Sequence, residues 1–241
     1  MRSSSAPGLF ESVHERGELL RYHGHRSAFA TIVLDGAYTE VCDDIPSVCP
    51  IGTIVVHDSA EQHADYFTTA GRCLNVELEH PPRQVLPAEA IPGNIRAAVD
   101  DLVRTYFLRA PGGALDRSIE RVQHLLNGRP APKQRTEPSW LDFVIDRFDW
   151  AGAAPLREAA ALADVHPTHF SREFHRKTGE TPNAFRRRAR VRRASELLLG
   201  TSERIAGIAV ACGFNDQSHL TRTFQAAIGL SPARYQSVFA R

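Results

Sequence analysis

The sequence predicts an α+β protein of two domains: an N-terminal β-barrel flanked by two helices, then an all-α domain with two helix-turn-helix units. Three observations predict this class. Short alternating apolar runs, broken by turn residues, fill most of residues 19–85. A polar, proline-rich segment follows at 128–138, and a helical pattern occurs twice after it. The 241 residues leave room for both domains.

The first domain is expected to run from 19 to 127, after a polar N-terminal arm at 1–18. Its strands include AFATIVLDGAY, with a turn at Asp35-Gly36, and the short runs GTIVVHD and RCLNVEL. Pro81, Pro82 and Pro87 are expected to stop strand pairing. Such a series of short strands indicates a small barrel or sandwich.

Two amphipathic helices are predicted next, over 94–109 and 115–126. Their apolar faces either cover the barrel or form a dimer contact, and the sequence leaves both alternatives open. Residues 128–138 then form the predicted interdomain linker.

The second domain, 139–241, is predicted to begin with a helix over 140–150. One helix-turn-helix unit follows at 156–179 and another at 205–229, with a long Arg-rich helix over 182–199 between them. The second helix of each unit carries the same pattern: His169, Phe170, Ser171, Arg172 and Phe174 recur as His219, Leu220, Thr221, Arg222 and Phe224. About 27 Å of linking helix suits two successive major grooves about 34 Å apart if the DNA bends.

Charge separates the two domains. Residues 139–241 hold 15 Lys and Arg against 10 Asp and Glu, whereas residues 1–138 hold 14 against 18. The basic domain is therefore the one that a polyanion attracts. The 4 scattered cysteines argue against a disulfide-stapled secreted domain, and the absence of a signal peptide or apolar span predicts a cytoplasmic protein with no membrane partner.

The repeated helices are expected to read double-stranded DNA. Their apolar positions predict a buried face, which leaves polar side chains for the groove. In the first unit these are Thr168, His169 and Arg172, with Ser171 and Arg176 nearer the DNA backbone. In the second they are Gln217, Ser218, His219 and Arg222. Because Arg pairs with guanine and Gln with adenine, Arg222 and Gln217 are the strongest candidates, whereas the Arg residues of the linking helix are expected to position the protein on phosphates.

The stretch from Ile205 to Tyr235 closely resembles the signature of AraC/XylS-family transcriptional regulators. The matching elements are Ile208-Ala209, Gly213-Phe214, Phe224, Gly229 and Ser231-Pro232. The resemblance covers about residues 139–241 and implies that both units enter consecutive major grooves. It also assigns base contacts to Thr168 and Arg172, and to Gln217, Ser218 and Arg222. The small side chain of Thr168 departs from the family and leaves the second unit with more of the discrimination.

Residues 20–80 resemble the cupin-type barrel with which members of this family often sense a ligand. The candidate effector residues are His23, His25, Tyr38, Glu40, His57 and His63. Strand alternation places His23 with His25, and Tyr38 with Glu40, on common faces. If the faces point inward, a metal would take His23, His25, His57 and His63. Metal-binding cupins place a Glu soon after the HxH pair, but RSAFA has no carboxylate here, so we expect neither a metal nor any other cofactor.

We therefore predict a sequence-specific, homodimeric transcription regulator, with double-stranded DNA, a small-molecule effector and RNA polymerase as partners. It is not expected to be an enzyme. Two alternatives stay open: a metal-dependent cupin enzyme fused to a DNA-binding domain, and an architectural DNA-binding protein whose barrel serves only for dimerisation.

Overall fold

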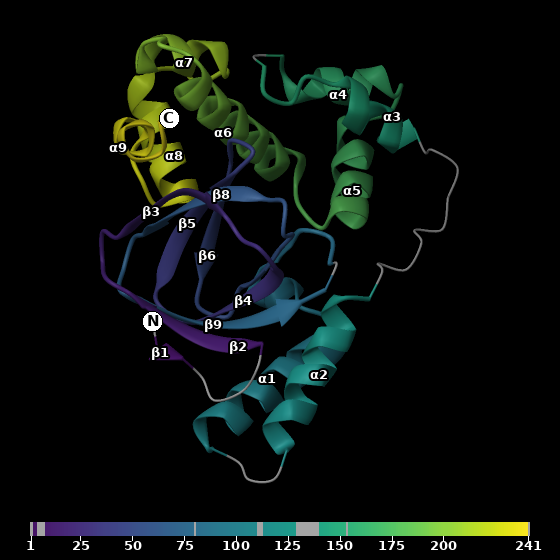
Figure 1. Ribbon diagram of the computed structural model, residues 1–241. Helices are drawn as coiled ribbons and strands as arrows, with labels where there is room; N and C mark the ends of the chain where they lie inside the picture. Colours follow the sequence, from purple (N-terminus) through teal and green to yellow (C-terminus); the bar gives the residue numbers. More distant parts are fainter. Residues whose placement is uncertain are drawn as a thin grey trace. The chain divides into compact units, whose positions relative to one another are not determined.

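The computed structural model describes residues 2–3, 8–79, 81–109, 113–128, 140–152 and 154–240, without the side chains of 2–3. The chain forms two compact units, Met1–Pro132 and Lys133–Arg241 (Figure 1). Of the predicted linker 128–138, all but Gly128 lies outside the described residues.

The first unit contains two antiparallel sheets, which the sequence predicted as a barrel. The six-stranded sheet has the order β1 (Arg2–Ser3), β2 (Leu9–His14), β9 (Gly71–Leu78), β4 (Ala28–Asp35), β7 (Ile54–His57) and β10 (Gln84–Leu86). The four-stranded sheet has the order β3 (Leu19–Gly24), β8 (Gln62–Phe67), β5 (Ala37–Cys42) and β6 (Ile45–Pro50). The described strands thus form two sheets and not one closed ladder.

Side-chain alternation along β4 gives the six-stranded sheet two buried faces. Ala30 and Ile32 point to one side, where they join a core that includes Leu102 and Val122. Those two residues belong to α1 (Gly93–Phe107) and α2 (Ala114–Leu126), which follow the short 3-10 helix Ala88–Ala90. The predicted helix pair therefore packs on its own sheet. Val33 points to the opposite side, into an apolar cluster with residues of the four-stranded sheet.

The predicted turn at Asp35-Gly36 is present and carries the chain from one sheet to the other. Gly36 has φ +75°, a left-handed conformation that favours glycine. A Cβ atom at this position would lie 2.0 Å from the carbonyl oxygen of Ala70. The Asp35 side chain accepts a hydrogen bond of 2.8 Å from the Gly36 amide.

Two predictions for this unit are wrong. Residues 1–18 are not simply an arm, because β2 pairs with β9 along its full length and buries Leu9. Prolines also do not end strand pairing after residue 81, because β10 pairs with β7. Pro82 and Pro87 lie outside β10, so no ladder amide is lost within it.

The second unit consists of helices. They are α3 (Trp140–Arg147), α4 (Leu156–Leu162), α5 (Pro167–Thr178), α6 (Pro182–Gly200), α7 (Ile205–Ala211), α8 (Gln217–Ile228) and α9 (Pro232–Phe239). Helices α4 and α5 form the first predicted helix-turn-helix unit, and α7 and α8 form the second. Helix α6 is the predicted linking helix, and its 19 residues span about 29 Å.

The repeated Gly-x-(Ser/Thr)-Pro sequence ends one helix and starts the next. Gly179 and Gly229 have φ +79° and +80° and end α5 and α8. Thr181 then accepts a hydrogen bond from the amide of Ala184, and Ser231 caps α9 in the same way. The pattern therefore sets the exit of each candidate reading helix.

Matching aromatic residues hold the two reading helices in place. Phe174 of α5 is fully buried and contacts Trp150 and Phe185, with ring centroids 5.1 and 5.3 Å away. In the second copy Phe224 is fully buried and meets Tyr235 of α9 at 5.2 Å. The apolar positions of the repeat are thus buried and anchor the helices, as predicted.

Close contacts at α6 join the segment before the first helix-turn-helix unit to the turn of the second. Arg186 and Arg190 both donate to the carbonyl oxygen of Gly152, at 2.9 and 2.7 Å. Gly213, in the turn between α7 and α8, approaches the same point. A Cβ atom on Gly213 would lie 2.7 Å from Arg190 Nη2 and 2.8 Å from the Gly152 oxygen. We call Gly152, Arg186, Arg190 and Gly213 the α6 junction.

Replacing Gly213 with Ala tests the α6 junction. The substitution adds a methyl group where no space exists, at φ +68°. We expect Gly213→Ala to lower the free energy of unfolding by about 1–3 kcal/mol, measured by denaturant unfolding. Gly200→Ala is the control, since nothing lies within 4 Å of the added atom and Ala favours a helix. Equal losses in both variants would contradict the close approach.

Candidate functional site

The predicted DNA-reading side chains of the first unit lie on the outer face of α5. Thr168, Ser171 and Arg172 are exposed, whereas Phe170 and Phe174 are buried. Arg172 and Arg176 have side chains 74 % and 75 % exposed. The face available to a ligand is therefore the one that the helical spacing predicted.

The carboxylate of Glu173 neutralises part of the positive charge of the arginines on α5. Arg176 donates to its carboxylate at 2.8 Å, and Arg172 Nε lies 3.7 Å from it. The hydrogen bond from Arg176 lowers the pKa of Glu173. Arg172 also donates to Nδ1 of His169 at 3.2 Å. Both arginines would have to leave these contacts before reaching DNA.

The predicted residues of the second unit are less constrained. Gln217, Ser218 and Arg222 are exposed on α8. Within the described residues, the Arg222 side chain forms no hydrogen bond or ion pair. His219 differs, because its ring stacks edge-on with Phe214 at 5.3 Å and accepts a hydrogen bond from the amide of Asn215. The structure thus gives His219 a place in the turn, although it was predicted for the groove.

The Arg residues of α6 divide into three groups. Arg186 and Arg190 are partly buried in the α6 junction, and burial lowers the pKa of each. Arg188 and Arg192 pair with Glu180 and Glu196 at 2.5 and 3.2 Å. Arg187 is exposed and, among the described residues, has no ion pair. Only part of the cluster is therefore available to phosphates, as the sequence indicated.

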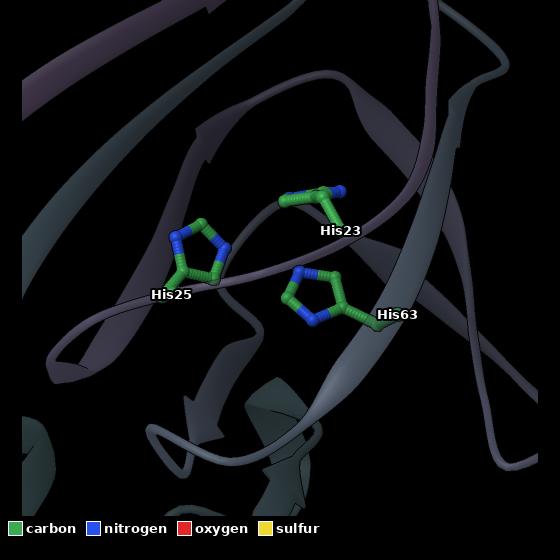
Figure 2. Close-up of side chains that lie close together, drawn as sticks. All are labelled: His23, His25 and His63. Atoms are coloured by element: carbon green, nitrogen blue, oxygen red, sulfur yellow. The ribbon is translucent and has the colours of Figure 1, made fainter.

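The candidate effector residues of the first unit meet between its sheets, because the strand register brings them together. His63 on β8 lies opposite His23 on β3 and opposite Cys42 on β5, and Asp65 lies opposite Glu40. His25 follows β3, and its ring centroid is 5.2 Å from that of His63 (Figure 2).

His57 enters the same cluster from the other sheet. It is 2 % exposed, and its ring stacks between Phe29 and His63 at 4.5 and 4.4 Å. All four predicted histidines therefore converge. Tyr38 is also buried, but it packs against Phe67 in the apolar cluster between the sheets.

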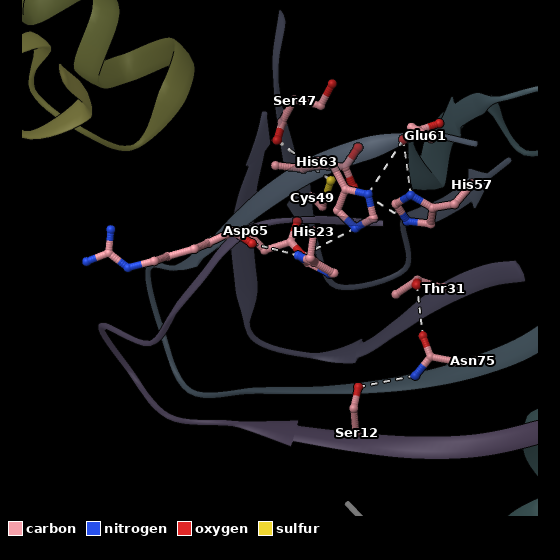
Figure 3. A network of polar contacts seen from close by, with 12 residues as sticks. Ser12, His23, Thr31, Ser47, Cys49, His57, Glu61, His63, Asp65 and Asn75 are labelled. Carbon is pink, nitrogen blue, oxygen red and sulfur yellow. Dashed lines mark hydrogen bonds and ion pairs between the residues drawn. The ribbon is translucent and has the colours of Figure 1, made fainter. Parts of the chain in front are cut away.

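Buried carboxylates surround these rings (Figure 3). Glu40 is 0 % exposed; one of its oxygens accepts from Arg83 at 2.5 Å, and the other lies 3.5 Å from His57 Nε2. Glu61 accepts from Arg83 at 2.9 Å and lies 3.2 Å from His57 Nδ1. Burial raises the pKa of Glu40. Burial also acts to raise the pKa of Glu61, but hydrogen bonds from His57 and Arg83 outweigh it and lower the value to about 2.

Burial favours the neutral imidazoles of His25 and His63. It is the main cause that lowers the pKa of His25 to about 4 and that of His63 to about 2, and the neighbouring histidines add to both shifts. Neutral imidazole is the form that binds a metal. Two overlapping triads, His23-His25-His63 and His57-Glu61-His63, each bring one ligand atom per residue within 4.8 Å of the others. The donor set therefore fits a divalent transition metal.

The sequence prediction omitted Glu61, Asp65 and Arg83. The signal for the first two was the spacing of two between residues 61, 63 and 65, although β8 itself begins at Gln62. Glu61 places a carboxylate beside His57 and His63. No local signal marks Arg83, since only the pairing of β10 with β7 brings it to the cluster.

Residues 159–237 match a family model described as a helix-turn-helix domain. The chain is 35% identical over 89 residues to an HTH-type transcriptional regulator of Mycobacterium tuberculosis, a match over 37% of this chain and 34% of that protein. It is 31% identical over 115 residues to the HTH-type transcriptional activator RhaR of Pectobacterium carotovorum, over 46% of this chain and 39% of that protein. The chain thus spans between a third and two fifths of the length of these relatives.

Two solved structures are also similar. The DNA-binding domain of AdpA, in complex with a target DNA, shows 28% identity and a TM-score of 0.37, covering 40% of this chain and 89% of that chain. Fatty acid-bound ToxT from Vibrio cholerae covers 100% of both chains at 10% identity and a TM-score of 0.41.

Among the described residues, no helix is long and apolar enough to cross a membrane.

Removing Arg83 tests the buried charge network. Arg83→Met would leave the carboxylate of Glu40 buried without its cation, so we expect the free energy of unfolding to fall by about 3 kcal/mol. Arg72→Met is a matched control, because Arg72 is 43 % exposed in its pair with Glu11 and should cost at most about 1 kcal/mol. Chemical denaturation of both variants measures the difference. If Arg83→Met were as stable as Arg72→Met, the network would not depend on this arginine.

Proposed function

We propose that this chain, which carries an AraC-type helix-turn-helix domain in its second unit, is a sequence-specific transcription regulator controlled by a ligand of its first unit. The match of residues 159–237 to the helix-turn-helix family model and the likeness to named transcriptional regulators support the DNA-binding part of this proposal. The proposal extends the regulatory role to the whole chain.

The main support for DNA binding is that an exposed arginine recurs at the same helix position in both helix-turn-helix units. Arg172 and Arg222 occupy equivalent positions on α5 and α8, and each lies two residues before a fully buried phenylalanine. Recurrence in two copies with the same helix ends supports a shared ligand-facing role. Arginine in this position suits a bidentate contact to guanine.

The two units are expected to contribute unequally. Arg172 is engaged by His169 and Glu173, and Thr168 has a short side chain. Arg222, together with Gln217 and Ser218, makes up the less constrained surface. These differences support the second helix-turn-helix unit as the main source of base discrimination, with Arg187 among the residues available for phosphate contact.

The first unit is proposed to sense the effector. Its support is a buried polar cluster whose histidines, Glu40 and Asp65 lie where an apolar core would be more stable. We further propose a homodimer that acts with RNA polymerase. None of the cluster residues is assigned a catalytic role.

Selection of double-stranded DNA from a random pool by the full-length protein tests the proposal. We expect enrichment of one site with two conserved segments about 10 base pairs apart, since each unit would enter its own major groove. Binding without any enriched sequence would instead identify an architectural DNA-binding protein.

Arg222→Ala tests the base-reading assignment. On the selected site we expect a loss of about 1–3 kcal/mol and relaxed preference at one base pair, measured by binding titrations with single-base variants. The matched control is Arg187→Ala, which should weaken binding to all sequences equally and reduce its salt dependence. An equal loss on random DNA for Arg222→Ala would show that Arg222 contacts phosphate.

A further inference from the structure

The imidazoles of His23, His25 and His63 form a compact group that DNA binding does not use. Figure 2 shows the three rings close together between the strands of the first unit. The centroid of His23 lies 4.8 Å from that of His25 and 4.5 Å from that of His63. One nitrogen from each ring lies within 4.8 Å of the other two.

The backbone fixes the tautomer of His23. Its Nδ1 lies 2.8 Å from the carbonyl oxygen of Arg21. Because a carbonyl can only accept, Nδ1 carries the proton and Nε2 of the neutral ring keeps its lone pair. Metal-bound histidines are oriented by this kind of outer hydrogen bond.

The other two rings have buried nitrogens without hydrogen bonds. His63 is 2 % exposed, and within the described structure its Nδ1 has no hydrogen-bond partner. Its Nε2 lies 3.7 Å from a carboxylate oxygen of Asp65. Nε2 of His25 is likewise buried without a hydrogen bond among the described residues. Unsatisfied buried nitrogens are costly, and a ligand between the rings would satisfy both.

The overlapping triad with His57 and Glu61 is less suited to a ligand. Both ring nitrogens of His57 already face carboxylates, Glu61 at 3.2 Å and Glu40 at 3.5 Å. Glu61 is held by Arg83 at 2.9 Å. His63 also lies near carboxylates, but its contacts are longer, 3.9 Å from Nδ1 to Glu61 and 3.7 Å from Nε2 to Asp65.

We propose that His23, His25 and His63 bind a divalent transition-metal cation, and that this cation is the signal sensed by the first unit. The role of the cation as the signal rests on the proposed regulatory function, whereas the binding site does not. Three neutral nitrogens suit Zn²⁺ and similar cations, whereas Mg²⁺ prefers oxygen ligands. Around a tetrahedral Zn²⁺ such nitrogens lie about 3.3 Å apart, so the rings would draw closer on binding. The fourth position stays open.

The surrounding charge favours a cation. Glu40 and Glu61 lie next to His57, and Asp65 lies next to His63. Arg83 is the positive side chain paired with Glu40 and Glu61. A bound cation would therefore enter a region where carboxylates outnumber the guanidinium group.

Titration of the metal-free full-length protein with Zn²⁺ and Co²⁺ tests the site. We expect one equivalent of Zn²⁺ to bind and to raise the melting temperature, and Co²⁺ to give the visible absorption of a nitrogen-ligated ion. Mg²⁺ should do neither. His23→Gln changes a half-buried ring and should weaken Zn²⁺ binding by more than about a hundredfold without unfolding the protein, as checked by circular dichroism. His63→Gln should do the same.

His124→Gln is the matched control, because His124 is exposed on α2, and it should bind Zn²⁺ like the wild type. Absence of stoichiometric Zn²⁺ binding by the wild type would overturn the proposal. So would Zn²⁺ binding that survives His23→Gln, or a Co²⁺ spectrum abolished by His57→Gln but not by His23→Gln, since that pattern identifies the other triad.

DNA binding separates this inference from the proposed function. If Zn²⁺ binds at the three histidines but leaves affinity for the selected DNA site unchanged, the site stands and its role as the signal is overturned. If the protein selects no DNA site, the regulatory function fails whatever the metal does. A change in DNA affinity with Zn²⁺ that is lost in His23→Gln supports both.

Discussion

In the second unit, close contacts at the α6 junction hold the start of the domain and the turn before α8 against one helix. Two guanidinium groups, from Arg186 and Arg190, converge on the Gly152 carbonyl, and the turn before α8 reaches the same place through Gly213. Because α5, α7 and α8 all pack against α6, neither reading helix is positioned by its own loop alone. Because Arg186 and Arg190 are partly buried, fewer arginines of α6 are available for phosphate contacts. The Arg-rich helix is therefore as much a structural element as an electrostatic one.

Between its two sheets, the first unit buries polar and titratable side chains as well as an apolar cluster. Alternation along the strands of the six-stranded sheet sends one set of residues to the core with α1 and α2 and the other set toward the four-stranded sheet. The cluster near this second set includes four histidines together with Glu40, Glu61 and Asp65. Such a buried polar group lowers stability unless its members are satisfied, and Arg83 satisfies only part of it. A ligand that satisfied the remaining buried polar atoms would stabilise this unit, which connects its structure with ligand binding.

Most of the fold was predictable because its local signals agree. The Asp35-Gly36 turn, the Gly-x-(Ser/Thr)-Pro helix boundaries and the buried phenylalanines each follow from short-range rules, and both helix-turn-helix units lie where the repeat placed them. What failed depended on distant partners. Leu9 to His14 look polar and irregular until β9 pairs with them, and Arg83 reaches Glu40 only because β10 joins the far edge of the sheet. His219 faces Phe214 because of the turn geometry, which its position in the repeat does not reveal.

Helix α6 is expected to hold the two reading helices at one fixed separation. The most direct test of this arrangement is DNA affinity after base pairs are inserted between the two halves of the selected site. A rigid junction predicts that insertion of half a turn, about 5 base pairs, and of a full turn, about 10, both reduce affinity to that of a site with one half randomised. Full affinity after the full-turn insertion would contradict the account, because it would require the two units to move independently of each other.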